Sequence, residues 1–189
     1  VTITAAFDEA MTSTPTISIS GTSISNQVMT KIIGGSGSGP GSLLGADIDG
    51  EAANDNSGYS VSLSSDGSRV AIGASGNDGN GTLSGHVRIY DYNGSAWVQV
   101  GDDIDGEAAN NYSGWSVSLS PDGSRVAIGA YGNDGAQNSN KTDSGHVRIY
   151  EYSSGSWNQL GDDIDGEAAN DNSGYSVSLS SDGSRVAIG

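Results

Sequence analysis

Apolar and polar residues alternate along most of this chain, which predicts β-strands rather than helices. Within one unit the expected strands are residues 59–64, 69–73, 86–92 and 96–100. In the first, Tyr59, Val61 and Leu63 alternate with serines, the period-two pattern of a strand with one buried face. The second, Arg-Val-Ala-Ile-Gly, is apolar on both faces. It is therefore expected to lie in the centre of a sheet.

Turn signals separate these strands. Asp66-Gly67 lies between the first two strands and Asn93-Gly94 between the last two, and both dipeptides favour tight hairpins because glycine accepts positive φ. The middle connection is a longer loop, residues 77–85, whose counterpart at 133–145 has thirteen residues instead of nine. An insertion accepted at one place indicates an exposed loop tip.

The same unit occurs three times. Residues 46–73, 102–129 and 162–189 are nearly identical. Four antiparallel strands in a repeat of about 40–60 residues are typical of a β-propeller blade. The predicted fold is all-β, with propeller-type blades over 46–189, divided into 46–101, 102–161 and a truncated 162–189. That amounts to a partial propeller of about two and a half blades after a short β segment.

A single blade cannot bury both of its faces. Propellers solve this by packing roughly four to eight blades into a ring. Because the chain starts at Val1 without a methionine and stops at Gly189 within a repeat, we expect it to be part of a longer protein. Further repeats or self-association are the expected cover for the open blade faces.

Residues 1–35 differ from the rest of the chain. Val1-Thr-Ile-Thr, the stretch Phe7–Met11 and the stretch Pro15–Gly21 resemble the start of bacterial immunoglobulin-like modules of large surface proteins. The resemblance implies a partial immunoglobulin-like β segment. Residues 36–45 are rich in Gly and Ser and are expected to form a linker and an entry strand.

Charge restricts the possible partners. The chain has 23 acidic and 7 basic residues, a net charge of −16. Nucleic acids and anionic membranes are therefore poor partners. No cysteine is present for disulfides or thiolate metal sites, and no apolar run reaches the length needed to insert into a membrane.

The repeated strands resemble the FG-GAP repeat, the blade unit of integrin-like β-propellers. The matching segments are Ser57–Leu63, Val70–Ala74, Gly85–Tyr90 and Trp97, with their counterparts in the second unit. The resemblance implies an extracellular or cell-surface protein. Calcium-binding members carry an acidic loop between the first two strands, whereas this chain has only Ser65–Ser68 there. One carboxylate cannot supply the six to eight oxygens that calcium prefers, so that site is not expected here.

The acidic stretch between units is the candidate metal site. Carboxylates at alternate positions before and after a glycine resemble the opening of a calcium loop. The candidate ligands are Asp47, Asp49, Glu51, Asp103, Asp105, Glu107, Asp163, Asp165 and Glu167. The competing interpretation is that these are turn residues whose side chains cap backbone groups. No other cofactor is expected.

Other candidate residues are interpreted structurally. His86 and His146 occupy equivalent strand positions but show no metal partner in the sequence. Trp97, Trp115 and Trp157 could stack on sugars, although packing is the favoured interpretation because they lie in strands. No nucleophile elbow, P-loop or dinucleotide fingerprint occurs, so no catalytic residue is assigned.

The sequence thus predicts a non-catalytic extracellular module for adhesion, ligand binding or spacing. An unidentified protein or carbohydrate ligand would contact the blade loops, including the variable loops 77–85 and 133–145. The alternative is a calcium-binding, calcium-stabilised repeat. A propeller enzyme is a third, less favoured interpretation.

Overall fold

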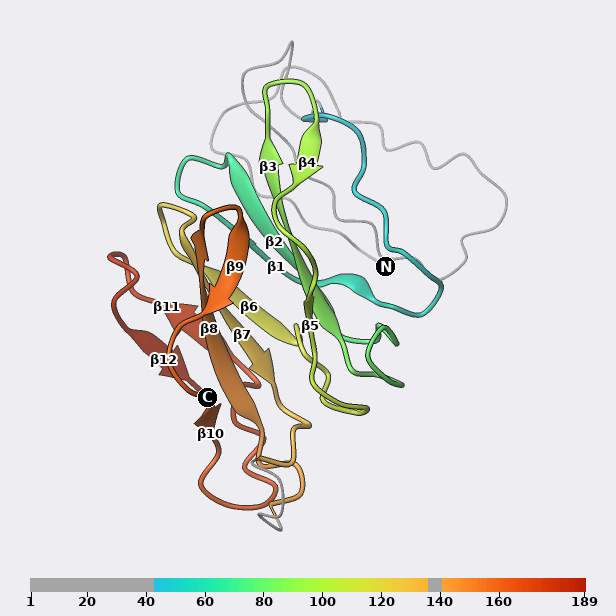
Figure 1. The fold of residues 1–189 in the computed structure, drawn as a ribbon, viewed down its shortest axis with the longest axis vertical. Coiled ribbons are helices and arrows are strands. Elements are labelled where there is room, and N and C mark those ends of the chain that lie inside the picture. The colour runs from blue at the N-terminus through green and yellow to red at the C-terminus, as the bar shows by residue number, and fades with distance from the viewer. Residues whose placement is uncertain (1–42, 136–140) are drawn as a thin grey trace, which may run out of the picture.

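The computed structural model describes residues 43–135 and 141–189, and every regular element in them is a β-strand (Figure 1). A search of these residues found no helix that could span a membrane. The predicted immunoglobulin-like segment 1–35 and most of the predicted linker 36–45 lie outside the described residues. The all-β prediction is confirmed.

The first unit is an antiparallel sheet with the order β1-β2-β3-β4. Its strands are β1 (Ser57–Leu63), β2 (Arg69–Ala74), β3 (His86–Tyr92) and β4 (Trp97–Gln99). The short β5 (Ile104–Asp105) returns to pair with the beginning of β3. The four strands agree with those expected from the alternation, with small differences at the ends.

The second unit repeats this sheet. Its strands are β6 (Ser116–Leu119), β7 (Arg125–Ala130), β8 (His146–Ser153), β9 (Ser156–Gln159) and β10 (Ile164–Asp165). A third, two-stranded sheet contains β11 (Val177–Leu179) and β12 (Val186–Ile188). The register is conserved between units, since Val70 pairs with Tyr90 and Val126 with Tyr150. The sheets stand side by side as partial propeller blades (Figure 1).

The Asp-Gly turns form as predicted. Asp66 Oδ1 accepts hydrogen bonds from the Ser64 hydroxyl at 2.7 Å and from the Ser68 amide at 3.0 Å. These bonds favour the ionised carboxylate and lower the pKa of Asp66 to about 2. Gly67 adopts a φ of 70°, which its missing side chain permits.

Much of the core lies between units. Ala71, Val87 and Ile89 of the first sheet pack against Val117 and Leu119 of the second. Val117 and Leu119 are only 9% and 6% exposed, whereas the equivalent residues of the first unit, at positions 61 and 63, are 52% and 48% exposed. The same apolar pattern is therefore buried only where a preceding blade covers it.

Serines on the opposite face of the inner strands contact the next unit. Ser60 donates its hydroxyl hydrogen bond to the Gly114 carbonyl at 2.7 Å, and the Ser62 hydroxyl accepts one from the Leu119 amide at 2.9 Å. The same two hydrogen bonds occur between the second and third units. Ser116 donates to the Gly174 carbonyl, and the Ser118 hydroxyl accepts from the Leu179 amide. The serines that alternate with the apolar residues thus set the spacing and register between blades.

An arginine crosses each junction at the other end of the strands. Arg69 forms a bidentate pair with Asp91 of its own sheet and donates to the Gly123 carbonyl of the next unit at 2.9 Å. Its guanidinium also lies 4.9 Å from the ring centroid of Tyr152. Arg125 repeats the pattern with Glu151 and Gly183. Each arginine therefore ties one blade to the hairpin turn of the next.

We expect Arg69→Ala to destabilise the protein by about 1–2 kcal/mol, because it removes a half-buried bidentate pair and an inter-unit hydrogen bond. Arg185 is the equivalent residue of the third unit and is exposed. Arg185→Ala is the matched control and should change stability by less than about 0.5 kcal/mol. Urea unfolding of both variants checks the difference. Equal effects would show that Arg69 does not connect the blades.

Candidate site at the junctions between units

The acidic connectors are residues 47–55, 103–111 and 163–171. The end of each connector is a capping turn. Asp55 Oδ2 accepts hydrogen bonds from the Ala52 amide at 3.1 Å and from Asn77 Nδ2 at 3.0 Å. Asn111 does the same for Ala108 and Asn133 in the next connector. This part of each connector has the capping role that the sequence offered as the competing interpretation.

The first junction cluster surrounds His86, which begins β3 and is only 1% exposed. Its Nδ1 lies 3.7 Å from Glu51 Oε2 and 3.6 Å from Asp103 Oδ2. Glu51 belongs to the connector that enters the unit and Asp103 to the connector that leaves it. Arg88 lies beside the cluster, with Nη1 3.5 Å from Glu51 Oε1 and Nη2 donating to the Asp49 carbonyl.

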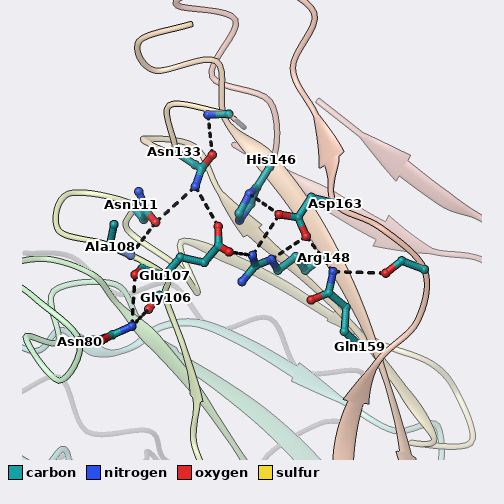
Figure 2. Close-up of polar contacts among 12 residues, drawn as sticks. Asn80, Gly106, Glu107, Ala108, Asn111, Asn133, His146, Arg148, Gln159 and Asp163 are labelled. Atoms are coloured by element: carbon teal, nitrogen blue, oxygen red, sulfur yellow. Dashed lines mark hydrogen bonds and ion pairs between the residues drawn. The ribbon is translucent and has the colours of Figure 1, made fainter. Parts of the chain in front are cut away.

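The second junction cluster has the same composition (Figure 2). His146 Nδ1 lies 3.6 Å from Asp163 Oδ2. Arg148 donates from Nε to Asp163 Oδ1 at 2.8 Å and from Nη2 to Oδ2 at 3.0 Å, and it also pairs with Glu107. Glu107 Oε2 accepts a further hydrogen bond from Asn133 Nδ2 at 3.4 Å. Figure 2 shows the guanidinium between the two carboxylates.

Burial controls the charge state of both histidines. Desolvation lowers the pKa of His86 and His146, and it outweighs the nearby carboxylates, which act in the opposite direction. Both imidazoles are therefore held neutral near pH 7. Burial acts to raise the pKa of the Asp163 carboxyl, but hydrogen bonds from Arg148 and Gln159 outweigh it, so that pKa is lowered. The clusters consequently combine a neutral imidazole, two carboxylates and one guanidinium.

The structure brings together only some of the carboxylates that the sequence proposed as metal ligands. Glu51 and Asp103 meet at His86, and Glu107 and Asp163 meet at His146, with the possible donor atoms of each group within 4.8 Å of one another. Within the described residues, the remaining candidates belong to no such group of three or more: Asp47, Asp49, Asp105, Asp165 and Glu167.

Sequence reasoning did not place the histidines in this site. The structure supplies the carboxylate partners that the sequence did not reveal, because Glu51 and Asp103 approach His86 only after the strands pair. The available signal was positional: each histidine begins the third strand of its unit and lies between two acidic connectors. That arrangement predicts convergence only once the connectors are known to return to the same strand end.

Two of the three tryptophans have a packing role, as expected. The Trp97 ring contacts Tyr92, and its Nε1 donates to the Leu44 carbonyl at 2.7 Å. Trp157 packs on Tyr152 and donates to the Val100 carbonyl at 2.8 Å. Both side chains thereby attach the fourth strand of a unit to the residues just before the connector that enters it.

Trp115 lies in a different environment. Its ring centroid is 4.3 Å from that of Tyr59 and 5.4 Å from that of Tyr175. The second unit adds Tyr112 and Tyr131, so aromatic rings from all three units contribute to this cluster. Because the rings contact one another, the cluster helps to align the inner strands of successive units.

Comparison with known families identifies the repeat. The model of the FG-GAP repeat matches residues 47–90 and 104–150, and no curated protein matches the chain. Each matched segment starts in an acidic connector and ends in the third strand of its sheet, so it includes the histidine and the first of the two carboxylates of its junction cluster. On the evidence of these two matches and of its sheets of four antiparallel strands, the chain is an FG-GAP-type repeat protein with an integrin-like repeat module.

Proposed function

We propose that this chain is a non-catalytic module of a secreted or surface protein, where it serves adhesion, ligand binding or spacing. The main observation in its favour is that the scaffold of each unit is constant whereas one of its loops varies. Strands, turns and junction contacts are repeated almost without change, whereas the loops 77–85 and 133–145 differ in length and composition. Variable loops on a constant scaffold are the usual arrangement of a recognition surface.

The variable loops are connected to the junctions. Asn80 Nδ2 donates to the Gly106 carbonyl at 2.8 Å, and Lys141 Nζ donates to the Gly166 carbonyl at 3.0 Å. Each loop therefore lies next to the acidic connector that follows it and is hydrogen-bonded to it. A ligand at this edge would meet a surface of negative charge, which favours basic protein segments or neutral glycans over anionic partners.

FG-GAP repeats are in general non-enzymatic. The chemistry of the junctions supports the same conclusion for this chain, since the carboxylates that meet there are held by arginine rather than placed across an open cleft. An adhesive or spacing role requires only the repeated scaffold and its loops.

A loop exchange tests the recognition role. In the variant, residues 133–145 are replaced by the nine-residue sequence of 77–85, and the intact chain and variant are compared on a glycan array and on purified matrix proteins. We expect the intact chain to bind and the variant to lose at least tenfold in affinity with an unchanged melting temperature. A matched control alters the Asn93-Gly94 hairpin, which lies at the opposite end of the strands.

If neither protein binds, the adhesive and ligand-binding roles are excluded and spacing remains. If the loop variant binds as tightly as the intact chain, the recognition surface does not include residues 133–145.

A metal-stabilised repeat is the second candidate, because two carboxylates from successive connectors meet at each complete blade. Calcium, the ion that the acidic pattern suggested, prefers six to eight oxygen ligands. Each cluster supplies two carboxylates and one imidazole nitrogen, and the carboxylates are shared with an arginine. This donor set suits calcium poorly.

We therefore expect millimolar calcium to shift the melting temperature by less than about 1 °C relative to EDTA. A ligand bound at 100 times its dissociation constant would add about 2.7 kcal/mol and shift the midpoint by several degrees. Differential scanning calorimetry of the full chain checks this. A calcium shift of that size, not reproduced by magnesium, would establish the calcium-stabilised repeat instead.

A further inference from the structure

We propose that each junction cluster binds a divalent transition-metal ion, best matched by Zn²⁺, through the histidine Nδ1 and one carboxylate from each flanking connector. The first site would use Glu51, His86 and Asp103, and the second Glu107, His146 and Asp163. This inference goes beyond the proposed adhesive or spacing role and does not depend on it.

Distances within the clusters fit a ligand shell better than a hydrogen-bonded pair. His86 Nδ1 lies 3.7 Å from Glu51 and 3.6 Å from Asp103, and His146 Nδ1 lies 3.6 Å from Asp163, whereas an N–H···O bond normally measures about 2.7–3.2 Å. The donor atom of Glu107 completes the second group within 4.8 Å. Zinc–nitrogen and zinc–oxygen bonds are about 2.0–2.2 Å long, and the corners of a tetrahedron of that size are about 3.4 Å apart. A small adjustment of the side chains would bring the donors to that separation.

A buried atom without a partner points to the same ligand. His146 Nδ1 is buried and has no hydrogen-bond partner among the described residues, although it faces Asp163 across 3.6 Å. A buried polar atom left unpaired is costly and uncommon in folded proteins. A metal ion between the imidazole and the carboxylates would satisfy it.

The donor types select among metals. One imidazole and two carboxylates suit Zn²⁺ and similar first-row ions, whereas Ca²⁺ and Mg²⁺ prefer shells made only of oxygen. Three protein ligands leave a fourth tetrahedral position for water. The site thus requires no ligand beyond those that the two connectors and the third strand provide.

The arginines set the strength of each site. A carboxylate offers about four lone-pair positions, so it can accept hydrogen bonds from a guanidinium and still bind a metal. Such outer partners orient ligands but also reduce the negative charge of the site. Arg148 pairs with both Glu107 and Asp163, while Arg88 pairs with Glu51. We therefore expect the His86 site to bind more tightly than the His146 site.

The chain has two histidines, one in each proposed site, so their imidazole NMR signals report metal binding in the unmodified protein. Metal-free full-length chain without a histidine tag is titrated with Zn²⁺, and the imidazole ¹⁵N resonances are recorded by NMR. We expect both Nδ1 resonances to shift, with saturation at two ions per chain. If neither Nδ1 resonance moves when the Zn²⁺ concentration exceeds that of the protein by about 0.1 mM, the proposal is wrong.

Variants assign the ligands by isothermal titration calorimetry, after circular dichroism has confirmed their folding. His86→Gln and His146→Gln should each remove one bound ion, and Glu107→Gln should weaken one site at least tenfold. Glu167→Gln is the matched control, since Glu167 occupies the same connector position but joins no such group within the described residues. Two ions bound with unchanged affinity by the double histidine variant would overturn the proposal.

Discussion

Replacing Gly73 with alanine is expected to destabilise the protein by about 3 kcal/mol. Gly73 is the next-to-last residue of β2, where the backbone of the next unit passes close by. A methyl group there would fall on the Gly114 carbonyl and on the Ser60 hydroxyl, far inside the 3.0 Å that real Cβ contacts respect. Such overpacking costs about 1–3 kcal/mol, and the lost Ser60–Gly114 hydrogen bond adds about 1 kcal/mol.

The repeat supplies the control for this prediction. Gly189 is the equivalent glycine of the third unit, and among the described residues a methyl group there would meet only the Ser176 hydroxyl, at 2.9 Å. Gly189→Ala should therefore cost less than about 1 kcal/mol. Urea unfolding followed by tryptophan fluorescence measures both variants. A Gly73→Ala effect no larger than that of Gly189→Ala would contradict the close approach of the two blades.

Truncating Leu119 to alanine is the second large effect expected. Leu119 is 6% exposed and belongs to the cluster formed with the first sheet, so its loss leaves a cavity between blades. Leucine-to-alanine changes in such positions cost about 2–5 kcal/mol. Leu63 occupies the same place in the first unit but is 48% exposed. Leu63→Ala should therefore cost less than about 1 kcal/mol.

The comparison of these two leucines separates strand propensity from inter-blade packing, since both lie at the same position of the first strand of a unit. Thermal melts of the two variants provide the measurement. Similar destabilisation by both would mean that Leu119 is not buried by a neighbouring blade.

Local pattern was sufficient to predict the strands. The alternation of Tyr59, Val61 and Leu63 and the Asp66-Gly67 turn depend on neighbouring residues only, and the structure has a strand and a hairpin there. Burial could not be read in the same way. It depends on whether another unit covers the face, which is why position 119 is buried and position 63 is not.

The candidate site was only half predictable. Alternate acids in the connectors identified Glu51 and Asp103 as possible ligands, but Asp47, Asp49 and Asp105 have the same local pattern and do not join the group. The selection is made by the return of each connector to the start of the third strand, a contact distant in sequence. His86 was missed because its partners come from two different connectors.

Successive units pack face to face as blades, and a double-mutant cycle between Ile89 and Leu119 is the sharpest test of this packing. The two residues belong to different units and to one buried cluster. We predict that Ile89→Val and Leu119→Ala will be non-additive, with a coupling energy of about 0.5–1 kcal/mol in urea unfolding, as expected for side chains that share one buried cluster. Additivity within about 0.3 kcal/mol would show that the two units do not share a core and would contradict the blade arrangement.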